Sequence, residues 1–374
     1  MNHPIRRLEV SNLIKKKSKM TLQIKFDNKT EDNYFHLTPT DKQNHILDRI
    51  RNLEQTFLRY AQLSYFHPLN YVSENSFYTY GCLTSMNGDV ISKENAYFFN
   101  VYDNVPVFVK LNLDLVKSFC IYNGLVCMAK VKIYKDNELQ VEELITFSSF
   151  ERSRTYMKEL NLEGVILKGP IESNTLSKIM DKTFNFLIIF GPFIKNDSFD
   201  QFIELIENEV IAKNNQIKVV LVPSLKDVAF FNDLPQPPLN LKNDQIICVS
   251  NPSIIEINEK IQIALVNYDV FKELNDNCLV YPNKEINFDN LCYYILNQNS
   301  FVPVLPSKYP INYQSNLNID KSINLFITSS DLSFEKSKIE SCQCTFINIS
   351  KDDQYLTIKG NQKIIDVDSV YINK

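Results

Sequence analysis

The sequence predicts a mixed α+β protein of several domains, and three observations indicate this fold class. A chain of 374 residues, 44% of them hydrophobic, is long enough for two or three cores. Short strand-forming runs separated by turn signals follow one another between residues 77 and 145. After residue 165, continuous apolar runs alternate with amphipathic segments of helical length. The short strands are typical of a small β-barrel, and the alternation of apolar runs with helical segments is typical of an α/β layered domain.

Residues 1–38 are predicted to form a flexible basic arm. They are polar, they show no sustained apolar period, and they carry a basic cluster at residues 15–19. One short strand is predicted within the arm, at residues 21–26. The basic cluster is interpreted as a solvated tail, and the alternatives are a nuclear localisation signal or a nucleic-acid contact.

A helix is predicted at residues 41–66, within a helical segment at 39–70. Thr40 and Gln43 match a capping box. The apolar residues that recur mostly at three- and four-residue steps are Ile46, Ile50, Leu53, Phe57 and Leu58. They form one stripe, which must pack against another element.

Residues 71–150 are predicted to form a barrel of the OB type. The expected strands are at residues 77–84, 96–101, 105–111, 125–133 and 139–144. Tyr122-Asn123-Gly124 is interpreted as the tight entry to the fourth of these strands.

Aromatic residues on the barrel strands allow two interpretations. OB barrels stack nucleic-acid bases on such rings over a basic groove. The residues concerned are Tyr78, Tyr80, Tyr97, Phe98 and Phe99. Because Lys and Arg are sparse here, we favour core packing and a barrel used for protein contact.

Residues 151–374 are predicted to form the α/β domain. Its buried strands are expected at residues 165–167, 186–190, 219–222, 246–249 and 325–327, and its helices at 199–212 and 289–296. The first three strands end at Gly169-Pro170, Gly191-Pro192 and Val222-Pro223-Ser224. In an open α/β sheet, a ligand site is normally assembled at such carboxyl ends.

Charge and composition limit the classes of function. The net charge is −4, and residues 1–70 hold 12 Lys and Arg against 7 Asp and Glu, while the remainder holds 28 against 37. An acidic body is poorly suited to bind nucleic acid on its own. The sequence has no run of about 18 apolar residues and no secretory signal pattern. Eight irregularly spaced cysteines favour free thiols in a reducing compartment.

The common catalytic motifs are absent. The seven glycines cannot be arranged into a P-loop, a GxGxxG fingerprint or a GxSxG elbow. Asp352-Asp353 is interpreted as a solvated turn, and Cys342-Gln343-Cys344 as part of a buried strand. All four histidines, at positions 3, 36, 45 and 67, precede the α/β domain. The imidazoles that a two-metal phosphoesterase uses are therefore missing from that domain.

Two blocks, one directly after residue 222 and one at residues 235–238, resemble the motif of a known family. The first, PSLKDV, consists of Pro223, Ser224, Leu225, Lys226, Asp227 and Val228. The second, PQPP, consists of Pro235, Gln236, Pro237 and Pro238. Together they resemble the B-subunit family of eukaryotic DNA polymerases, in the version carried by its polymerase alpha members.

Further matches in chain order extend this resemblance over residues 40–374. They are the two Gly-Pro strand ends and segments at residues 293–300, 303–306, 326–332 and 342–350. In that family an OB barrel is joined to a calcineurin-like phosphoesterase domain, which is inactive in eukaryotic members. The resemblance thus implies an OB-type β-barrel plus an inactive α/β calcineurin-like phosphoesterase domain.

The strand ends give positions for a vestigial metal site. Active relatives carry Asp-x-His, Gly-Asp and Gly-Asn-His there. The matching positions in this chain are Gly169, Ile171, Pro192, Ser224 and Leu225. These residues are poorly suited to coordinate a metal, so the resemblance implies no catalytic residue, no metal and no cofactor.

The resemblance implies an accessory scaffold of the DNA polymerase alpha-primase complex in the nucleus. The implied partners are the C-terminal domain of the catalytic subunit, the primase subunits, a telomere single-strand-binding complex and other replisome proteins. DNA would be reached only through the complex, and no membrane is involved. Primer synthesis at origins, on lagging strands and at telomeres is the implied process. The family usually begins with a helical recruitment domain and a linker, and only the arm precedes residue 39 here. The roles of that domain are therefore not carried over.

Two alternatives remain. One is an active metal-dependent phosphodiesterase or nuclease. The other is an independent single-stranded nucleic-acid binder that uses the barrel.

Overall fold

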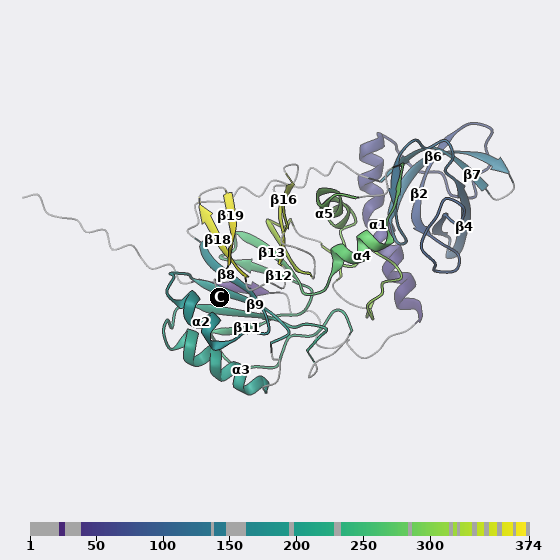
Figure 1. The fold of residues 1–374 in the computed structure, drawn as a ribbon. Helices are drawn as coiled ribbons and strands as arrows, with labels where there is room; N and C mark the ends of the chain where they lie inside the picture. The colour runs from purple at the N-terminus through teal and green to yellow at the C-terminus, as the bar shows by residue number, and fades with distance from the viewer. Residues whose placement is uncertain are drawn as a thin grey trace, which may run out of the picture.

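The computed structural model describes residues 22–26, 39–135, 138–146, 162–193, 198–227, 233–282, 286–313, 317–319, 322–330, 335–339, 344–349, 354–361 and 364–371. These residues form a closed β-barrel, a long helix beside it, and two six-stranded sheets flanked by shorter helices (Figure 1). Figure 1 places helix α1 between the barrel and the helices α4 and α5 of the larger part.

The barrel contains the five strands that the sequence predicted. They are β2 (Phe77–Thr84), β3 (Tyr97–Tyr102), β4 (Val105–Asn112), β6 (Val126–Lys135) and β7 (Glu138–Ile145). The barrel closes in the order β2-β3-β4-β7-β6. All neighbouring pairs are antiparallel except β4 with β7, which is parallel. A sixth strand in this region, β5 (Phe119–Ile121), was not predicted and pairs outside the barrel with β14 (Leu279–Tyr281).

Helix α1 (Pro39–Ala61) covers one side of the barrel. Its stripe residues Ile50, Leu53 and Phe57 are at most 2% exposed, and they pack on Tyr80 and Phe99 of the barrel with other buried side chains. The predicted stripe is confirmed. The helix starts at Pro39, two residues before the predicted start. It ends at Ala61, five residues before the predicted end at residue 66. Gln62, the next residue, has a left-handed backbone with φ of 55°.

The α/β region is built on two sheets. One has the order β11-β10-β9-β8-β18-β19 and the other β1-β12-β13-β15-β17-β16. The strands of the first sheet are β8 (Leu162–Lys168), β9 (Phe186–Phe190), β10 (Lys218–Val222), β11 (Ile246–Cys248), β18 (Gln354–Asn361) and β19 (Ile364–Tyr371). Those of the second are β1 (Ile24–Phe26), β12 (Ser253–Ile257), β13 (Ile261–Val266), β15 (Leu325–Ser329), β16 (Glu335–Ile339) and β17 (Cys344–Ile349). Strand β1 confirms the short strand predicted in the arm, and the rest of the arm lies outside the described residues.

Alternating side chains of the central strands build the layers of this region. In β9, Ile188 faces the core between the two sheets, whereas Leu187 and Ile189 face the helices. Helices α2 (Ser173–Met180) and α3 (Phe199–Ile206), with the π-helical turn Glu207–Ile211, cover the first sheet. Helices α4 (Val270–Asn277) and α5 (Phe288–Asn297) contribute to the core on the outer side of the second. All five predicted apolar runs are strands here. The sequence did not predict that these strands would be divided between two sheets that pack on each other.

Gly124, at the predicted entry to β6, fixes a close contact between the barrel and the α/β region. Its φ is +93°, and a Cβ at this position would lie 2.7 Å from the nitrogen of Leu305 and 2.8 Å from the oxygen of Pro303. Only glycine therefore fits both the backbone conformation and the space.

We predict that Gly124→Ala lowers the free energy of unfolding by about 3 kcal/mol, as measured by urea denaturation. Gly88→Ala is the matched control, because Gly88 also has positive φ, at +74°, yet has no neighbouring atom within 4 Å of its Cβ position. The control should lose about 1 kcal/mol from backbone strain alone. Equal losses in the two variants would contradict a crowded contact at Gly124.

Candidate functional site at the strand ends

The carboxyl ends of β8, β9, β10 and β13 lie together on one edge of the two sheets. Their side chains and turns form a strand-end cluster, which we define as Gly169, Gly191, Pro192, Ser224, Asp227 and Asn267. Three of the five predicted vestigial positions, Gly169, Pro192 and Ser224, are thus close neighbours.

The glycines of the cluster are in close contact with the neighbouring strand ends. A Cβ on Gly169 would lie 2.1 Å from the carbonyl oxygen of Pro192. A Cβ on Gly191 would lie 2.4 Å from Oδ2 of Asp227 and 3.1 Å from Cβ of Ser224. A side chain at Gly169 has no room to extend between the strands.

Asp227 is the carboxylate of the cluster, and both of its oxygens accept backbone hydrogen bonds. Oδ1 accepts from the amide of Phe193 at 2.8 Å, and Oδ2 accepts from the amide of Ser224 at 2.9 Å. Burial raises the pKa of Asp227, and these two hydrogen bonds oppose that rise. The Asp of PSLKDV therefore holds the turns after β9 and β10 against each other.

Asn267, directly after β13, ties the second sheet to the ends of the first. Its Nδ2 donates to the carbonyl oxygens of Gly191, Val222 and Pro223 at 3.0–3.2 Å. The backbone N–H of Asn267 donates to Oδ1 of Asn251 at 2.7 Å.

Asn251 in turn donates from Nδ2 to Oε1 of Gln236 at 2.8 Å. Gln236, the Gln of PQPP, is fully buried. The two motif blocks therefore meet through one network of neutral amides that ends on the strand-end carbonyls. Buried networks of this kind fix one geometry because each member has its partners.

The donor groups of the cluster do not suit a pair of divalent metals. Such metals need several carboxylate or imidazole ligands with free lone pairs. The cluster offers one carboxylate, which is already engaged by two amides, and amide groups that are committed to backbone carbonyls. Within the described ranges, no group of three or more His, Cys, Asp or Glu is placed to hold a metal.

The remaining predicted site residues lie around the cluster. Ile171 packs into the core under α2, and Leu225 packs against the core shared with the barrel. Lys226 is exposed and Pro235 is buried. Val228 lies outside the described residues. Sequence reasoning did not identify Asn251 and Asn267, because a single asparagine after a strand is not a distinctive pattern.

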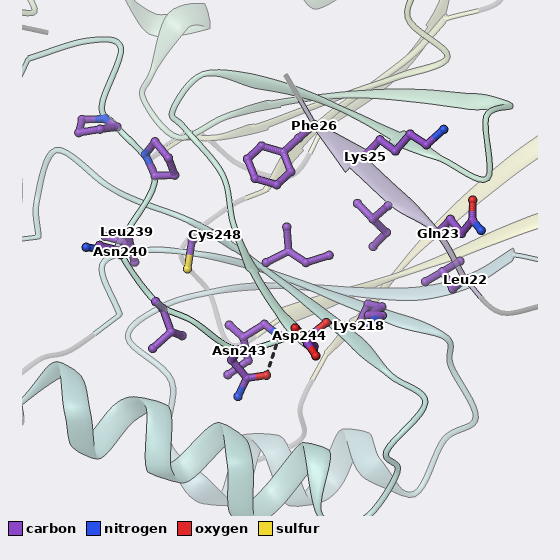
Figure 2. Close-up of a pocket in the computed structure, with 16 residues that line it drawn as sticks. Leu22, Gln23, Lys25, Phe26, Lys218, Leu239, Asn240, Asn243, Asp244 and Cys248 are labelled. Atoms are coloured by element: carbon purple, nitrogen blue, oxygen red, sulfur yellow. Dashed lines mark hydrogen bonds between the residues drawn. The ribbon is translucent and has the colours of Figure 1, made fainter. Parts of the chain in front are cut away.

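Pro237 and Pro238 lie away from the cluster and line a groove. The groove has a volume of ≈ 880 Å³ and lies between β1 and residues 237–248. Figure 2 shows Leu22 to Phe26 on one side of it and Leu239, Asn240 and Asn243 on the other. The second motif block therefore contributes both to the buried network and to a surface groove.

The other predicted features have separate outcomes. Tyr80, Phe98 and Phe99 are at most 8% exposed, which confirms core packing for these three barrel aromatics, whereas Tyr78 and Tyr97 are partly exposed. Cys344 is buried at the start of β17. Cys342 and Asp352-Asp353 lie outside the described residues.

A second set of buried polar groups joins α1, the barrel and the α/β region. The guanidinium of Arg49 is fully buried and donates to the carbonyl oxygens of Gly124 at 3.0 Å and Pro303 at 3.2 Å, and to Oε1 of Gln298 at 3.1 Å. Gln298 also accepts from the amide of Val126 and donates to its carbonyl oxygen. Gln298 therefore pairs with β6 as a neighbouring strand would.

His45, one turn before Arg49, is also buried. Burial, and then the positive charge of Arg49, lower the pKa of His45 to about 3. The unfolded chain therefore binds a proton on His45 below its ordinary pKa of about 6.5, and the folded chain does not. Above pH 6.5 the imidazole is neutral in both states and does not reduce the free energy of unfolding. As the pH falls from 6.5 towards 3, protonation of the unfolded chain lowers the free energy of unfolding.

We predict that His45 makes the protein lose about 2 kcal/mol of unfolding free energy between pH 7 and pH 5. The measurement is urea denaturation of the wild type and of His45→Asn at both pH values. The variant should lack this part of the pH dependence, whatever its absolute stability. Parallel pH dependences in the two proteins would contradict the prediction.

Comparison with known proteins is informative at the level of sequence. A family described as the B subunit of DNA polymerase alpha/epsilon matches residues 164–334. The B subunit of DNA polymerase alpha from Dictyostelium discoideum is 27% identical over 260 residues, which cover 61% of this chain and 39% of that protein. Its counterpart from Drosophila melanogaster is 23% identical over 229 residues, covering 55% and 37%. The matched segment thus spans about two fifths of the length of these relatives.

Among solved structures, TT1561 of Thermus thermophilus aligns with 57% of this chain and 99% of its own. Its sequence identity of 9% and TM-score of 0.29 are too low to support an argument.

The closed barrel and the two-sheet region define a mixed α+β protein whose strand-end site is filled by backbone and amide contacts. The match over residues 164–334 and the two curated relatives support assignment of the chain to the B-subunit family of DNA polymerases alpha and epsilon. The two curated relatives named above are B subunits of DNA polymerase alpha.

Proposed function

We propose that this chain is a non-catalytic scaffold of DNA polymerase alpha-primase, which binds the C-terminal domain of the catalytic subunit. The observation that carries the proposal is the strand-end cluster. An enzyme of this architecture would keep metal ligands there, but Gly169 contacts Pro192, and Asp227 is engaged by two backbone amides. The edge of the sheets where an active site would lie is occupied by contacts that join the two sheets, such as those of Asn267.

The overall arrangement supports assigning residues 71–150 to an OB-type barrel and residues 151–374 to an inactive calcineurin-like phosphoesterase domain. Five strands in a Greek-key order suit the OB type. Two sheets packed face to face with outer helices suit the second domain. Arg49 and Gln298 join these parts, as a rigid platform requires.

Primase would be held through the catalytic subunit, during primer synthesis at origins, on lagging strands and in telomere C-strand fill-in. Telomere single-strand-binding proteins and other replisome proteins are further proposed partners, and the nucleus is the proposed location. The acidic body of the chain favours protein docking over direct DNA binding. No helix among the described residues combines the length and apolar character that crossing a membrane requires.

Co-expression with the C-terminal domain of a polymerase alpha catalytic subunit tests the proposal. We expect the two chains to co-purify as a stable complex by size-exclusion chromatography. A folded chain that elutes alone would overturn the proposal.

The alternative functions have their own measurements. Hydrolysis of a phosphodiester with Mn²⁺, abolished by EDTA, would establish an enzyme in place of a scaffold. Tight binding of single-stranded DNA by the isolated chain, with a steep salt dependence, would establish an independent nucleic-acid binder.

A further inference from the structure

Strands β5 and β14 form a two-stranded ribbon between distant parts of the chain. Strand β5 lies in the segment that connects barrel strands β4 and β6, and β14 lies between α4 and α5 of the α/β region. The strands are antiparallel, with Cys120 opposite Val280 and Ile121 opposite Leu279.

The register of this ribbon brings two cysteines together. Side chains two residues apart on a strand share a face, so Cys278, two residues before Val280, lies on the same face as Cys120 and diagonal to it. The Cys278 thiol donates a hydrogen bond to the sulfur of Cys120, and both cysteines are free and partly exposed.

We propose that Cys120 and Cys278 are a peroxide-oxidisable pair, which closes into a disulfide that links the barrel segment to the α/β region. In the first step the Cys120 thiolate attacks one oxygen of hydrogen peroxide. The S–O bond forms, the O–O bond breaks, and the leaving hydroxide takes a proton to become water. In the second step the sulfur of Cys278 attacks that of Cys120. The S–S bond forms, and the hydroxyl leaves with the Cys278 proton as a second water. Two electrons pass from the sulfurs to the peroxide.

The surroundings of the two sulfurs assign their order of reaction. The hydrogen bond from Cys278 lowers the pKa of Cys120, burial partly opposes this, and a smaller lowering contribution comes from Tyr294. The same hydrogen bond, together with burial, raises the pKa of Cys278. Cys120 is thus the better source of thiolate, and Cys278 is placed to resolve its sulfenic acid.

Other cysteines in the described part of the chain differ from this pair. Cys82, Cys127 and Cys248 are buried, and burial raises the pKa of each. Oxidation should therefore be selective for the ribbon. Disulfides in reducing compartments are usually transient and redox-sensing, which fits a reversible link of this kind.

The test is oxidation of the reduced full chain with hydrogen peroxide, followed by alkylation and peptide mapping by mass spectrometry without reductant. We expect the Cys120–Cys278 linked peptide as the main new product, and its loss on adding dithiothreitol. The oxidised chain should melt about 5 °C higher than the reduced chain, because the link closes a long loop.

Three variants make the test specific. Cys278→Ser should stop at a Cys120 sulfenic acid that dimedone traps, and Cys120→Ser should leave Cys278 unmodified. Cys248→Ser, a matched buried thiol on β11, should form the disulfide as the wild type does. Recovery of Cys120 and Cys278 as separate alkylated thiols from the folded, peroxide-treated wild type would overturn the proposal. So would oxidation of Cys120 to sulfinic acid in preference to the linked form.

Discussion

Replacing Arg49 with alanine is expected to lower the free energy of unfolding by about 3 kcal/mol or more. The guanidinium donates to the carbonyl oxygens of Gly124 and Pro303 and to Gln298, across the junction of α1, the barrel and the α/β region. Alanine would leave these buried acceptors without that donor and would create a cavity. Removing a buried charge recovers some desolvation energy, but hydrogen bonds to a charged donor are each worth about 1.5–3 kcal/mol, and several are lost together.

Arg51→Ala is the matched control on the same helix. The Arg51 side chain is 69% exposed and its contact with Asp48, at 3.5 Å, is a surface ion pair. Its loss should change stability by less than about 1 kcal/mol. Urea denaturation followed by circular dichroism measures both variants. An Arg49→Ala protein within about 1 kcal/mol of the wild type would show that the guanidinium does not hold the junction.

The strands were largely predictable because their signals are local. The run Phe77–Thr84 is rich in aromatic and β-branched residues and is bounded by turn residues, and Phe186–Phe190 is apolar throughout; both strands have the predicted bounds. Strands β5 and β14 have three residues each and are ordered by pairing with each other across more than a hundred residues of chain. No local pattern identifies such strands, so the sequence did not predict them.

The residues that hold the junction were hidden for a related reason. Arg49 has the sequence context of an ordinary charged residue on a surface helix, and its burial depends on carbonyls at Gly124 and Pro303. For the strand ends, the resemblance located Gly169, Pro192 and Ser224, and strand order then brought them together. Asn267 comes from the other sheet, and its role is visible only once the two sheets are packed.

Replacing Gly169 with aspartate is expected to destabilise the protein by about 3 kcal/mol or more and to create no metal site. The new Cβ would lie 2.1 Å from the oxygen of Pro192, which is backbone and cannot move aside as a side chain can. The aspartate would also bring a charge close to a carbonyl oxygen, without a cation to balance it. We expect a lower urea midpoint and no Mn²⁺ binding by isothermal titration calorimetry.

Ile171→His is the companion variant, because it adds a possible metal ligand to the same loop. Ile171 is only partly buried, so the imidazole can be accommodated at a cost of about 1 kcal/mol, again without metal binding. The contrast separates two reasons why a site can be lost: absent ligands, which a substitution can supply, and a backbone that has closed over the space. If Gly169→Asp, alone or with Ile171→His, kept wild-type stability and bound Mn²⁺, the strand ends would still have room for a metal. The close contact of Gly169 with Pro192 would then not exclude a metal ion from this edge of the sheets.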